Sequence, residues 1–339
     1  MDFTPTEEQR AARELAAEIL DRSTEPWKAL CEAGLVAAVE EIGLLGLVLL
    51  LEEAGRRTAE IPLAATCAYG LLPVAAHGTD EQRARLLPGL RDGSYTATGA
   101  FPHRSARAVA SGDGWRLTGT FPVVPWLREA THVLVPADTG AGTDTVTRLF
   151  WLPVPAGAEP VDTTAPWAAA RLVLDGTPAE PLGDASAYAE VLAQARTAFA
   201  GLQAGVCAGS LARAVAYTSV REQFGRPLST NQGVLLRAAD AHMDTEAIRV
   251  TAYEAAWRFD HHLPAASHAL TAAWWASEGG KRVVHAGQHL HGGIGADLEH
   301  PVHRHFLWGR QLDAYLGGGA EVLAELGVLL GAPDTEEAV

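Results

Sequence analysis

The segment whose residue types are best suited to chemistry is REQFGRPLSTNQ, residues 221–232. It interrupts an Ala-rich region that otherwise has the spacing of a helix. Gly225 and Pro227 favour a sharp turn of the backbone. The guanidinium of Arg221 is a planar fork that suits phosphate oxygens, and Phe224 adds an apolar face. The segment predicts a turn between two helices that presents a cation and a ring. The alternative is a plain turn whose Arg221 pairs with a local carboxylate.

A second segment, HLHGGIG at residues 289–295, is rich in glycine. Because Gly292 and Gly293 have no Cβ, their backbone N–H groups can come close to a phosphate. A Gly-Gly-x-Gly sequence says little by itself, so this segment gains meaning only together with the first one.

Metal binding is a third chemistry to consider, because six histidines fall between residues 285 and 305. Two histidines in an H-x-H sequence diverge by roughly 200° around a helix, and no pattern of carboxylates accompanies them. We therefore expect no metal site and interpret these residues as solvated or interface histidines: His285, His289, His291, His300, His303 and His305.

Composition limits the partners and the compartment. The formal charge of −15 argues against nucleic acid or an anionic membrane as a partner, because binding a polyanion requires a clustered positive field. Cys31, Cys67 and Cys207 are few and widely spaced, which is typical of buried thiols in a reducing compartment. The N-terminus has no signal-peptide pattern, and the longest apolar run, residues 42–51, is too short to span a bilayer. We expect a cytoplasmic protein.

The elements that position these segments begin with a helical domain over residues 1–93. Thr4 or Thr6 is the expected cap of the first helix. The apolar run at 42–51 predicts a helix that is buried on most sides. Residues 78–93, GTDEQRARLLPGLRDG, contain a cap, a helix and a glycine stop.

The remaining chain predicts a β domain and a second helical domain. Short β-branched and aromatic runs divided by Gly, Pro and Asp indicate a middle antiparallel β domain over 94–184. Residues 185–332 return to long Ala- and Leu-rich helices with short breaks, which predicts a four-helix bundle. The last residues, 333–339, are expected to be frayed. The fold class is mostly α with a central β domain.

This order of domains, together with the motifs, resembles the acyl-CoA dehydrogenase family over essentially the whole chain. The first segment matches the signature R-x-x-F-G-x-P-x-x-x-x-Q, and the second resembles Q-x-x-G-G-x-G. The resemblance implies the acyl-CoA dehydrogenase fold and a loop that points at the FAD of a neighbouring subunit. The residues that it implies for the ADP half of FAD are Arg221, Phe224, Asn231, Gln232, His289, Gly292 and Gly293.

Two departures from the family pattern concern its flavin contacts. The glutamine of the second signature falls on His289, with Gln288 one place early, and a histidine differs in reach and can become charged. The family's Trp-(Ile/Val)-(Thr/Ser) contact falls on Val123-Val124-Pro125, where the proline has no N–H to donate.

A third departure concerns the catalytic base. The family removes an α-proton with a glutamate that comes from one of two places, and the carboxylate must lie close to the α-carbon. The first place falls on Leu316 or Gly317 and the second on Ala195, next to Arg196. None of these residues can act as a base, so we expect no catalytic residue at either position.

The pattern is similar to that of the shorter, non-catalytic subunit of heterotetrameric (α2β2) bacterial acyl-CoA dehydrogenases that act on steroid side-chain thioesters. The resemblance implies FAD shared with a longer subunit that carries the glutamate and most of the acyl-CoA site, and an electron-transfer flavoprotein as acceptor. The chain alone is expected to be inactive. Two alternatives stay open: a stand-alone enzyme that uses Asp313 or Glu299 as a displaced base, and a flavin-free acyl-CoA-binding protein.

Overall fold

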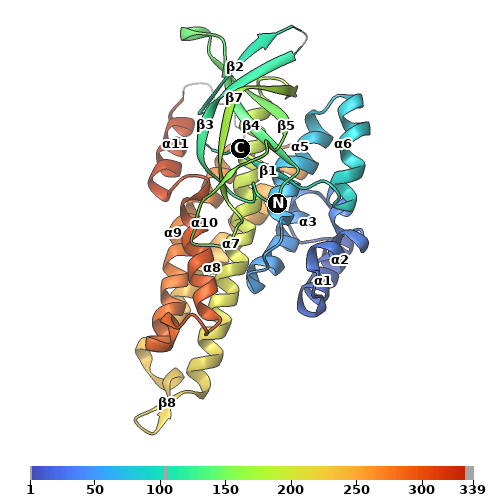
Figure 1. The fold of residues 1–339 in the computed structure, drawn as a ribbon. Helices are drawn as coiled ribbons and strands as arrows, with labels where there is room; N and C mark the ends of the chain where they lie inside the picture. The colour runs from blue at the N-terminus through green and yellow to red at the C-terminus, as the bar shows by residue number, and fades with distance from the viewer. Residues whose placement is uncertain (1, 103–104, 113, 333–339) are drawn as a thin grey trace. The chain divides into compact units, whose positions relative to one another are not determined.

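The computed structural model describes residues 2–102, 105–112 and 114–332, so the tail predicted at 333–339 lies outside the described residues. The chain forms two compact units, each built from several segments (Figure 1). We call them the bundle unit (Met1–Asp21, Leu44–Ala59 and Arg196–Val339) and the barrel unit (Arg22–Gly43 and Glu60–Ala195). The division into three sequence domains stays a prediction.

The bundle unit holds the long helices of the chain. Helices α8, α10 and α11 pack on α9. The four helices predicted for this region are present as α7 to α10, and a fifth follows the glycine-rich break after Tyr315. The helices that contribute to the unit are α1 (Glu7–Arg22), α3 (Leu35–Arg57, from Leu44 onward), α7 (Ala187–Val220, from Arg196 onward), α8 (Gln232–Asp260), α9 (Ala266–His291), α10 (Val302–Tyr315) and α11 (Gly319–Gly331).

Helix α3 is broken at Gly43, where φ is +73° and ψ is −171°, a conformation that favours glycine. The helix resumes at Leu44 with a cap from a distant residue: the Asp260 carboxylate accepts from the N–H groups of Leu44 (2.6 Å) and Leu45 (3.0 Å). Residues 47–51 that follow are at most 1% exposed. The expectation of a helix buried on most sides is confirmed.

A buried carboxylate connects three helices of the bundle unit. Glu52 on α3 is fully buried and accepts a hydrogen bond from the Tyr253 hydroxyl of α8 (2.7 Å). It also pairs with Arg249 of α8 (2.8 Å) and with Arg13 of α1 (3.5 Å). Because burying a lone carboxylate is costly, these partners specify how the three helices meet.

In the barrel unit, short helices precede the strands: α2 (Pro26–Glu32), α4 (Leu63–Thr66), the π-helical turn η1 (Cys67–Leu71), α5 (Leu72–His77) and α6 (Asp80–Asp92). Helix α6 has the predicted ends. Thr79 and Gln82 form a reciprocal capping box at its start, and Gly93, with φ of +77°, ends it in the left-handed conformation. In the bundle unit, Thr6 is the cap of α1, and its partner is Gln9.

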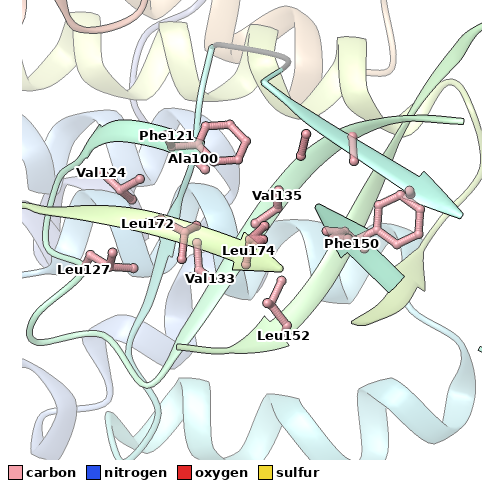
Figure 2. Packing of buried hydrophobic residues seen from close by; sticks show 14 of the residues in the cluster. Ala100, Phe121, Val124, Leu127, Val133, Val135, Phe150, Leu152, Leu172 and Leu174 are labelled. Carbon is pink, nitrogen blue, oxygen red and sulfur yellow. The ribbon is translucent and has the colours of Figure 1, made fainter. Parts of the chain in front are cut away.

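The strands close into a barrel. Its order is β2-β3-β7-β5-β4, and β4 returns to β2. The strands are β1 (Ala97–Gly99), β2 (Ala106–Ser111), β3 (Gly114–Val124), β4 (His132–Thr139), β5 (Val146–Pro153), β6 (Glu159–Pro160) and β7 (Ala170–Leu182). The core between them is apolar and includes Phe121, Val133, Phe150 and Leu172 (Figure 2).

The prediction of an antiparallel β domain holds for most pairs of strands, but it needs one correction, because β4 pairs in parallel with both β1 and β2. Residues 97–99 and then 106–107 lie in succession along one edge of β4. The two strands thus act as consecutive pieces of one extended segment. Such a pairing depends on contacts distant in sequence, which the pattern of local turns does not reveal.

Two described helical stretches are long and apolar enough to cross a membrane by length and composition: α7 and Val302–Gly331. The bent pair of α2 and α3 would count as a third if it formed one span. The most apolar part of α7 is 72% buried inside the protein, and the most apolar part of Val302–Gly331 is 17% buried. The expectation that no segment is long enough was based on uninterrupted apolar runs, and it missed helices in which polar residues interrupt the pattern.

Candidate cofactor-binding site

The predicted turn between two helices is a short β-hairpin at one end of the bundle unit. Its strands are β8 (Glu222–Gln223) and β9 (Arg226–Pro227), joined by Phe224 and Gly225. Both joining residues have positive φ, +53° and +75°, as in the tight turns that match the twist of paired strands. The Leu228 N–H donates to the Arg221 carbonyl oxygen (2.8 Å) and closes the hairpin. The prediction of a turn here is confirmed.

Phe224 is an unusual residue for this turn. A bulky side chain at positive φ is uncommon, because the Cβ crowds the backbone. The ring is also fully exposed, at 101% relative to a reference residue. An aromatic residue with a strained backbone and an exposed ring at the tip of a hairpin indicates a role in binding rather than in stability.

The residues after the hairpin begin α8. The Asn231 side-chain oxygen accepts from the Gly233 N–H (3.0 Å) and caps this helix. Gln232 is the first residue of the helix, and it is exposed, as is Arg221. Asn231 therefore has a structural role, and its amide nitrogen is the part of the side chain that the cap leaves for a ligand.

The second predicted segment begins where α9 ends. Gly292 has φ of +65° and ψ of −143°, a combination available essentially to glycine alone. The Gly292 N–H donates to the His289 carbonyl oxygen. This N–H was expected to bind a phosphate, but it is already engaged in a hydrogen bond within the chain. Gly293, which follows, is exposed. It begins the short 3₁₀ turn together with Gly292, since η4 covers Gly292–Ala296.

Gln288 and His289 have different positions around this loop. The Gln288 amide nitrogen donates to the Gly295 carbonyl oxygen, so Gln288 braces the loop from within. His289 is exposed. The geometry therefore leaves His289 as the side chain available to a ligand at this point of the motif.

Two aromatic residues bring the motifs together. The rings of Tyr217 and His291 stack with centroids 4.9 Å apart. Tyr217 lies one helical turn before Arg221, and His291 directly precedes Gly292. The hairpin and the glycine loop thus lie at the same end of the bundle unit, although about 70 residues separate them in the sequence. The sequence reasoning did not identify Tyr217, because nothing in the sequence says what its ring faces.

His291 is buried, and its Nδ1 donates to the Gly287 carbonyl oxygen (2.7 Å). Burial lowers the pKa of His291, and the hydrogen bond to Gly287 opposes this effect. A neutral imidazole beside Tyr217 is therefore a packing element that positions the glycine loop.

The hairpin and the helical residues on either side of it concentrate positive charge. Between residues 213 and 237 there are four arginines and one acidic residue, Glu222, in a chain whose net charge is −15. A local positive field with planar guanidinium donors suits an anionic diphosphate. The donor set and the exposed ring therefore fit the ADP half of FAD.

The positions where a catalytic glutamate was sought carry side chains without acid–base chemistry. Ala195 is fully buried and Leu316 is 6% exposed. Arg196 donates from Nε to the Leu316 carbonyl oxygen (3.2 Å) and pairs with Glu325 of α11 through two contacts of 2.8 and 2.7 Å. A carboxylate is thus present near Arg196, and it neutralises the guanidinium.

A small cavity lies beside this ion pair. Centres of water molecules can occupy about 20 Å³ of it, which is enough for about one water. The rings of Phe199 and Tyr315 meet edge to face at 4.8 Å in its wall. The lining residues are Arg196, Phe199, Ala200, Ala273, Ala276, Leu312, Tyr315, Leu316 and Gly317.

The two candidates for a displaced base lie elsewhere. Asp313 is 8% exposed, and its Oδ2 lies 2.8 Å from Arg310 Nη1. Burial raises the pKa of Asp313, and the charge of Arg310 opposes this effect. Glu299 is exposed in the loop before α10. Neither residue lines the cavity described above.

In the barrel unit, the segment aligned with the family's flavin contact packs on its own core. The Pro125 carbonyl oxygen accepts from the Thr98 hydroxyl (2.6 Å). The next residue, Trp126, has φ of +58°, and its ring stacks on Trp167 at 4.4 Å. Both rings are at most 4% exposed, so a neighbouring indole already covers this aromatic surface.

Metal binding gains no support from the geometry. Within the described ranges, no group of three or more His, Cys, Asp or Glu side chains is arranged to hold an ion.

Two family models match the chain. The model described as "Acyl-CoA dehydrogenase, N-terminal domain" matches residues 2–94, and "Acyl-CoA dehydrogenase, C-terminal domain" matches residues 185–327. Among characterised proteins, "Acyl-CoA dehydrogenase FadE27" of Mycobacterium tuberculosis is 31% identical over 96% of this chain and 98% of its own length. FadE28 of the same organism is 30% identical with the same coverage.

Two solved structures are also similar over nearly the whole chain. One is described as "Tcur3481-Tcur3483 steroid ACAD G363A variant"; it is 40% identical, with a TM-score of 0.89, and covers 96% of this chain and 98% of its own. The other is the ChsE4-ChsE5 complex from Mycobacterium tuberculosis, 29% identical, with a TM-score of 0.90 and coverage of 98% and 100%. Both similarities extend through the bundle and the barrel units.

Proposed function

Because the chain belongs to the acyl-CoA dehydrogenase family, we propose that it is the non-catalytic subunit of a heteromeric, FAD-dependent acyl-CoA dehydrogenase. In this proposal it completes the FAD site of a longer partner subunit, which carries the glutamate and most of the acyl-CoA site. The observation that carries the proposal is a contrast within the bundle unit. The hairpin presents Arg221 and an exposed Phe224, while Arg196 beside the base position is neutralised by Glu325.

The chemistry that FAD supplies when bound is acceptance of a hydride from the acyl β-carbon. The role proposed for this chain is to hold the ADP half of the cofactor. Arg221 binds the pyrophosphate oxygens, and Phe224 covers the adenine or ribose side. Gln232, His289 and the amide of Asn231 add polar contacts.

The further parts of the proposal concern substrate, acceptor and compartment. A similar structure is described as a "steroid ACAD" variant and another as the ChsE4-ChsE5 complex. These descriptions support a bulky, steroid-type acyl-CoA and a two-chain assembly. We propose an electron-transfer flavoprotein as the acceptor and the cytoplasm as the compartment.

The test is flavin content with and without a partner. Co-expression with a longer homologue that carries the glutamate should give a yellow complex with about two FAD molecules per tetramer, one for each symmetry-related composite site. The chain purified alone should be colourless and inactive. Stoichiometric FAD and turnover in the chain alone would refute the proposal.

A further inference from the structure

The loop between α9 and α10 is closed by two histidines at its ends. His291 is the last residue of α9, and His300 lies two residues before α10 begins at Val302. The centroids of the two rings are 5.0 Å apart and their planes are tilted by 59°, which is within the range of aromatic pairs. Residues 292–299 thus form a compact loop whose ends are in contact, and loops of this kind are frequently functional. The glycine motif lies at the beginning of this loop.

Hydrogen bonds fix the orientation of both rings. His291 donates from Nδ1 to the Gly287 carbonyl oxygen. His300 has the opposite arrangement: its Nδ1 accepts from the Val302 N–H (3.3 Å), so the proton of the neutral ring is on Nε2. This N–H is among those that the first turn of a helix leaves without an intrahelical acceptor. The His300 ring therefore caps α10 and contacts His291 at the same time.

Contacts inside the loop tie His300 to the glycines. The Gln288 amide nitrogen donates to the Gly295 carbonyl oxygen. The Asp297 N–H donates to the Ile294 carbonyl oxygen (3.1 Å), and the His300 N–H donates to the Asp297 carbonyl oxygen (3.1 Å). His300 is thus attached by its backbone to the rest of the loop and by its ring to the end of α9. A displacement of this ring would be transmitted to the glycines.

A third ring extends these contacts to the hairpin. Tyr217 of α7 stacks on His291, with centroids 4.9 Å apart and planes 22° apart. His291 therefore contacts Tyr217 and His300, and the three rings join α7, the end of α9 and the start of α10. Arg221 follows Tyr217 by one helical turn, and Gly292 follows His291 directly. The three rings thus couple the position of the glycine loop to that of the hairpin.

We propose that His300 is a positioning residue for FAD binding. Through its ring contact with His291 it holds the glycine loop beside the hairpin, so that His289 and Arg221 are presented to the cofactor together. The inference rests on the proposed function and deepens it by adding a residue that lies outside both sequence motifs. His300 is half-buried, and it acts through His291 rather than by touching FAD.

The test separates the ring of His300 from its role as a cap. His300→Ala removes both. His300→Phe keeps a ring beside His291 but loses the acceptor for the Val302 N–H. The matched control is His285→Ala, which removes another histidine ring of α9 and α10 contacts, one that packs on Phe306 with centroids 5.0 Å apart.

Fluorescence titration of the apo form of the two-chain complex measures the affinity for FAD. We expect this affinity to fall about 10-fold in His300→Ala, which is near the upper size of one aromatic contact. His300→Phe should stay within about twofold of wild type, and His285→Ala should be unchanged. Both variants of His300 should be less stable to urea, because both lose the cap. A merely structural role therefore predicts that their affinities fall together.

Hydrogen–deuterium exchange of this chain alone gives a second measurement that does not depend on FAD. The backbone amides of residues 292–299 should exchange faster in His300→Ala than in wild type, and His300→Phe should restore most of the protection. Unchanged exchange in His300→Ala would overturn the inference.

The titration separates the inference from the proposed function. Wild-type FAD affinity in His300→Ala, or an equal loss in His300→Phe, would overturn the positioning role and leave the proposed function intact. A wild-type complex that binds no FAD would refute the proposed function and the inference with it. Loss of affinity in His300→Ala, with recovery in His300→Phe, is the result we expect.

Discussion

At the scale of single residues, the hairpin holds a bulky side chain in an unfavourable backbone conformation and exposes its ring. Phe224 occupies a left-handed conformation that costs an ordinary side chain roughly 1–2 kcal/mol, and its ring is exposed. Asparagine or glycine would relieve the backbone, so the ring itself is the feature that the turn preserves. The hairpin also carries two cations, Arg221 at its base and Arg226 directly after the turn.

Arg221→Ala should weaken FAD binding in the two-chain complex by about 10- to 100-fold, because a hydrogen bond to a charged group contributes about 1.5–3 kcal/mol. Arg226→Ala removes the same charge from the opposite strand of the hairpin and should have a much smaller effect. Fluorescence titration of the apo-complex with FAD measures both. Equal losses of FAD affinity in the two variants would show that Arg221 contributes only its positive charge and makes no specific contact.

His305 is a buried histidine with a predictable response to pH. It is 1% exposed, and its Nε2 donates to the Arg56 carbonyl oxygen (3.0 Å). Gly209 allows this approach, because a Cβ there would lie 2.5 Å from the ring. Burial is the main cause that lowers the pKa of His305 to about 4, although the hydrogen bond to Arg56 opposes it.

Since an unfolded histidine titrates near 6.5, the unfolded chain binds more protons than the folded chain between about pH 6.5 and 4. The free energy of unfolding should therefore fall as pH decreases through this window, by about 3 kcal/mol in total from this residue. Urea unfolding of wild type and His305→Gln at several pH values isolates the contribution as a difference. Parallel pH profiles for the two proteins would contradict it.

At the scale of elements, the ion pair of Arg196 and Glu325 fastens α11 to α7. Arg196 is 7% exposed, whereas the Glu325 side chain is 50% exposed. Of the residues in α11, Gly319 and Val322 are buried. The ion pair with α7 therefore adds a specific attachment to the packing of α11 on α9.

Glu325→Gln should lower the free energy of unfolding by about 1–2 kcal/mol, between the values for exposed and buried pairs, because it leaves a buried guanidinium without its counter-charge. Arg196→Met should cost less, since a methionine can fill the space without a charge. A double-mutant cycle measured by urea unfolding gives the coupling energy. A coupling near zero would show that the pair does not hold α11.

What the sequence predicted well is local. The cap and the glycine stop predicted for the helix within 78–93, and the turn predicted at the first motif, depend on residues close together in the chain. The structure has all three, with Thr79 and Gln82 as the capping box, Gly93 as the stop and Phe224 and Gly225 in the turn. The family motifs also identified the arrangement of helices and strands. In these cases the signal and the contact lie within one helical turn or one hairpin.

What the sequence did not predict depends on distant residues. Asp260 caps α3 at Leu44, 216 residues away. Glu325 reaches Arg196 across 129 residues, and β4 pairs in parallel with two earlier strands.

At the scale of the whole molecule, cofactor binding and association of subunits should be linked. A ligand that binds only the assembled complex stabilises that complex in proportion to the logarithm of its concentration. Adding FAD should therefore raise the melting temperature of the two-chain complex, while the melting temperature of this chain alone should not change. Differential scanning fluorimetry with matched protein concentrations tests this. A comparable rise in the melting temperature of the chain alone would show that this chain holds a complete FAD site by itself.

The exposed tip of the hairpin also has a consequence for how much of the protein a cell can tolerate. If the proposed partner is absent, the chain exposes Phe224 at the hairpin and Leu236, Met243 and Val250 on α8 to solvent. Exposed apolar surface of this kind promotes aggregation and binding by chaperones. The two chains would then have to be synthesised in matched amounts. An excess of this chain should be cleared faster than the assembled pair, so its abundance would be set by the supply of its partner.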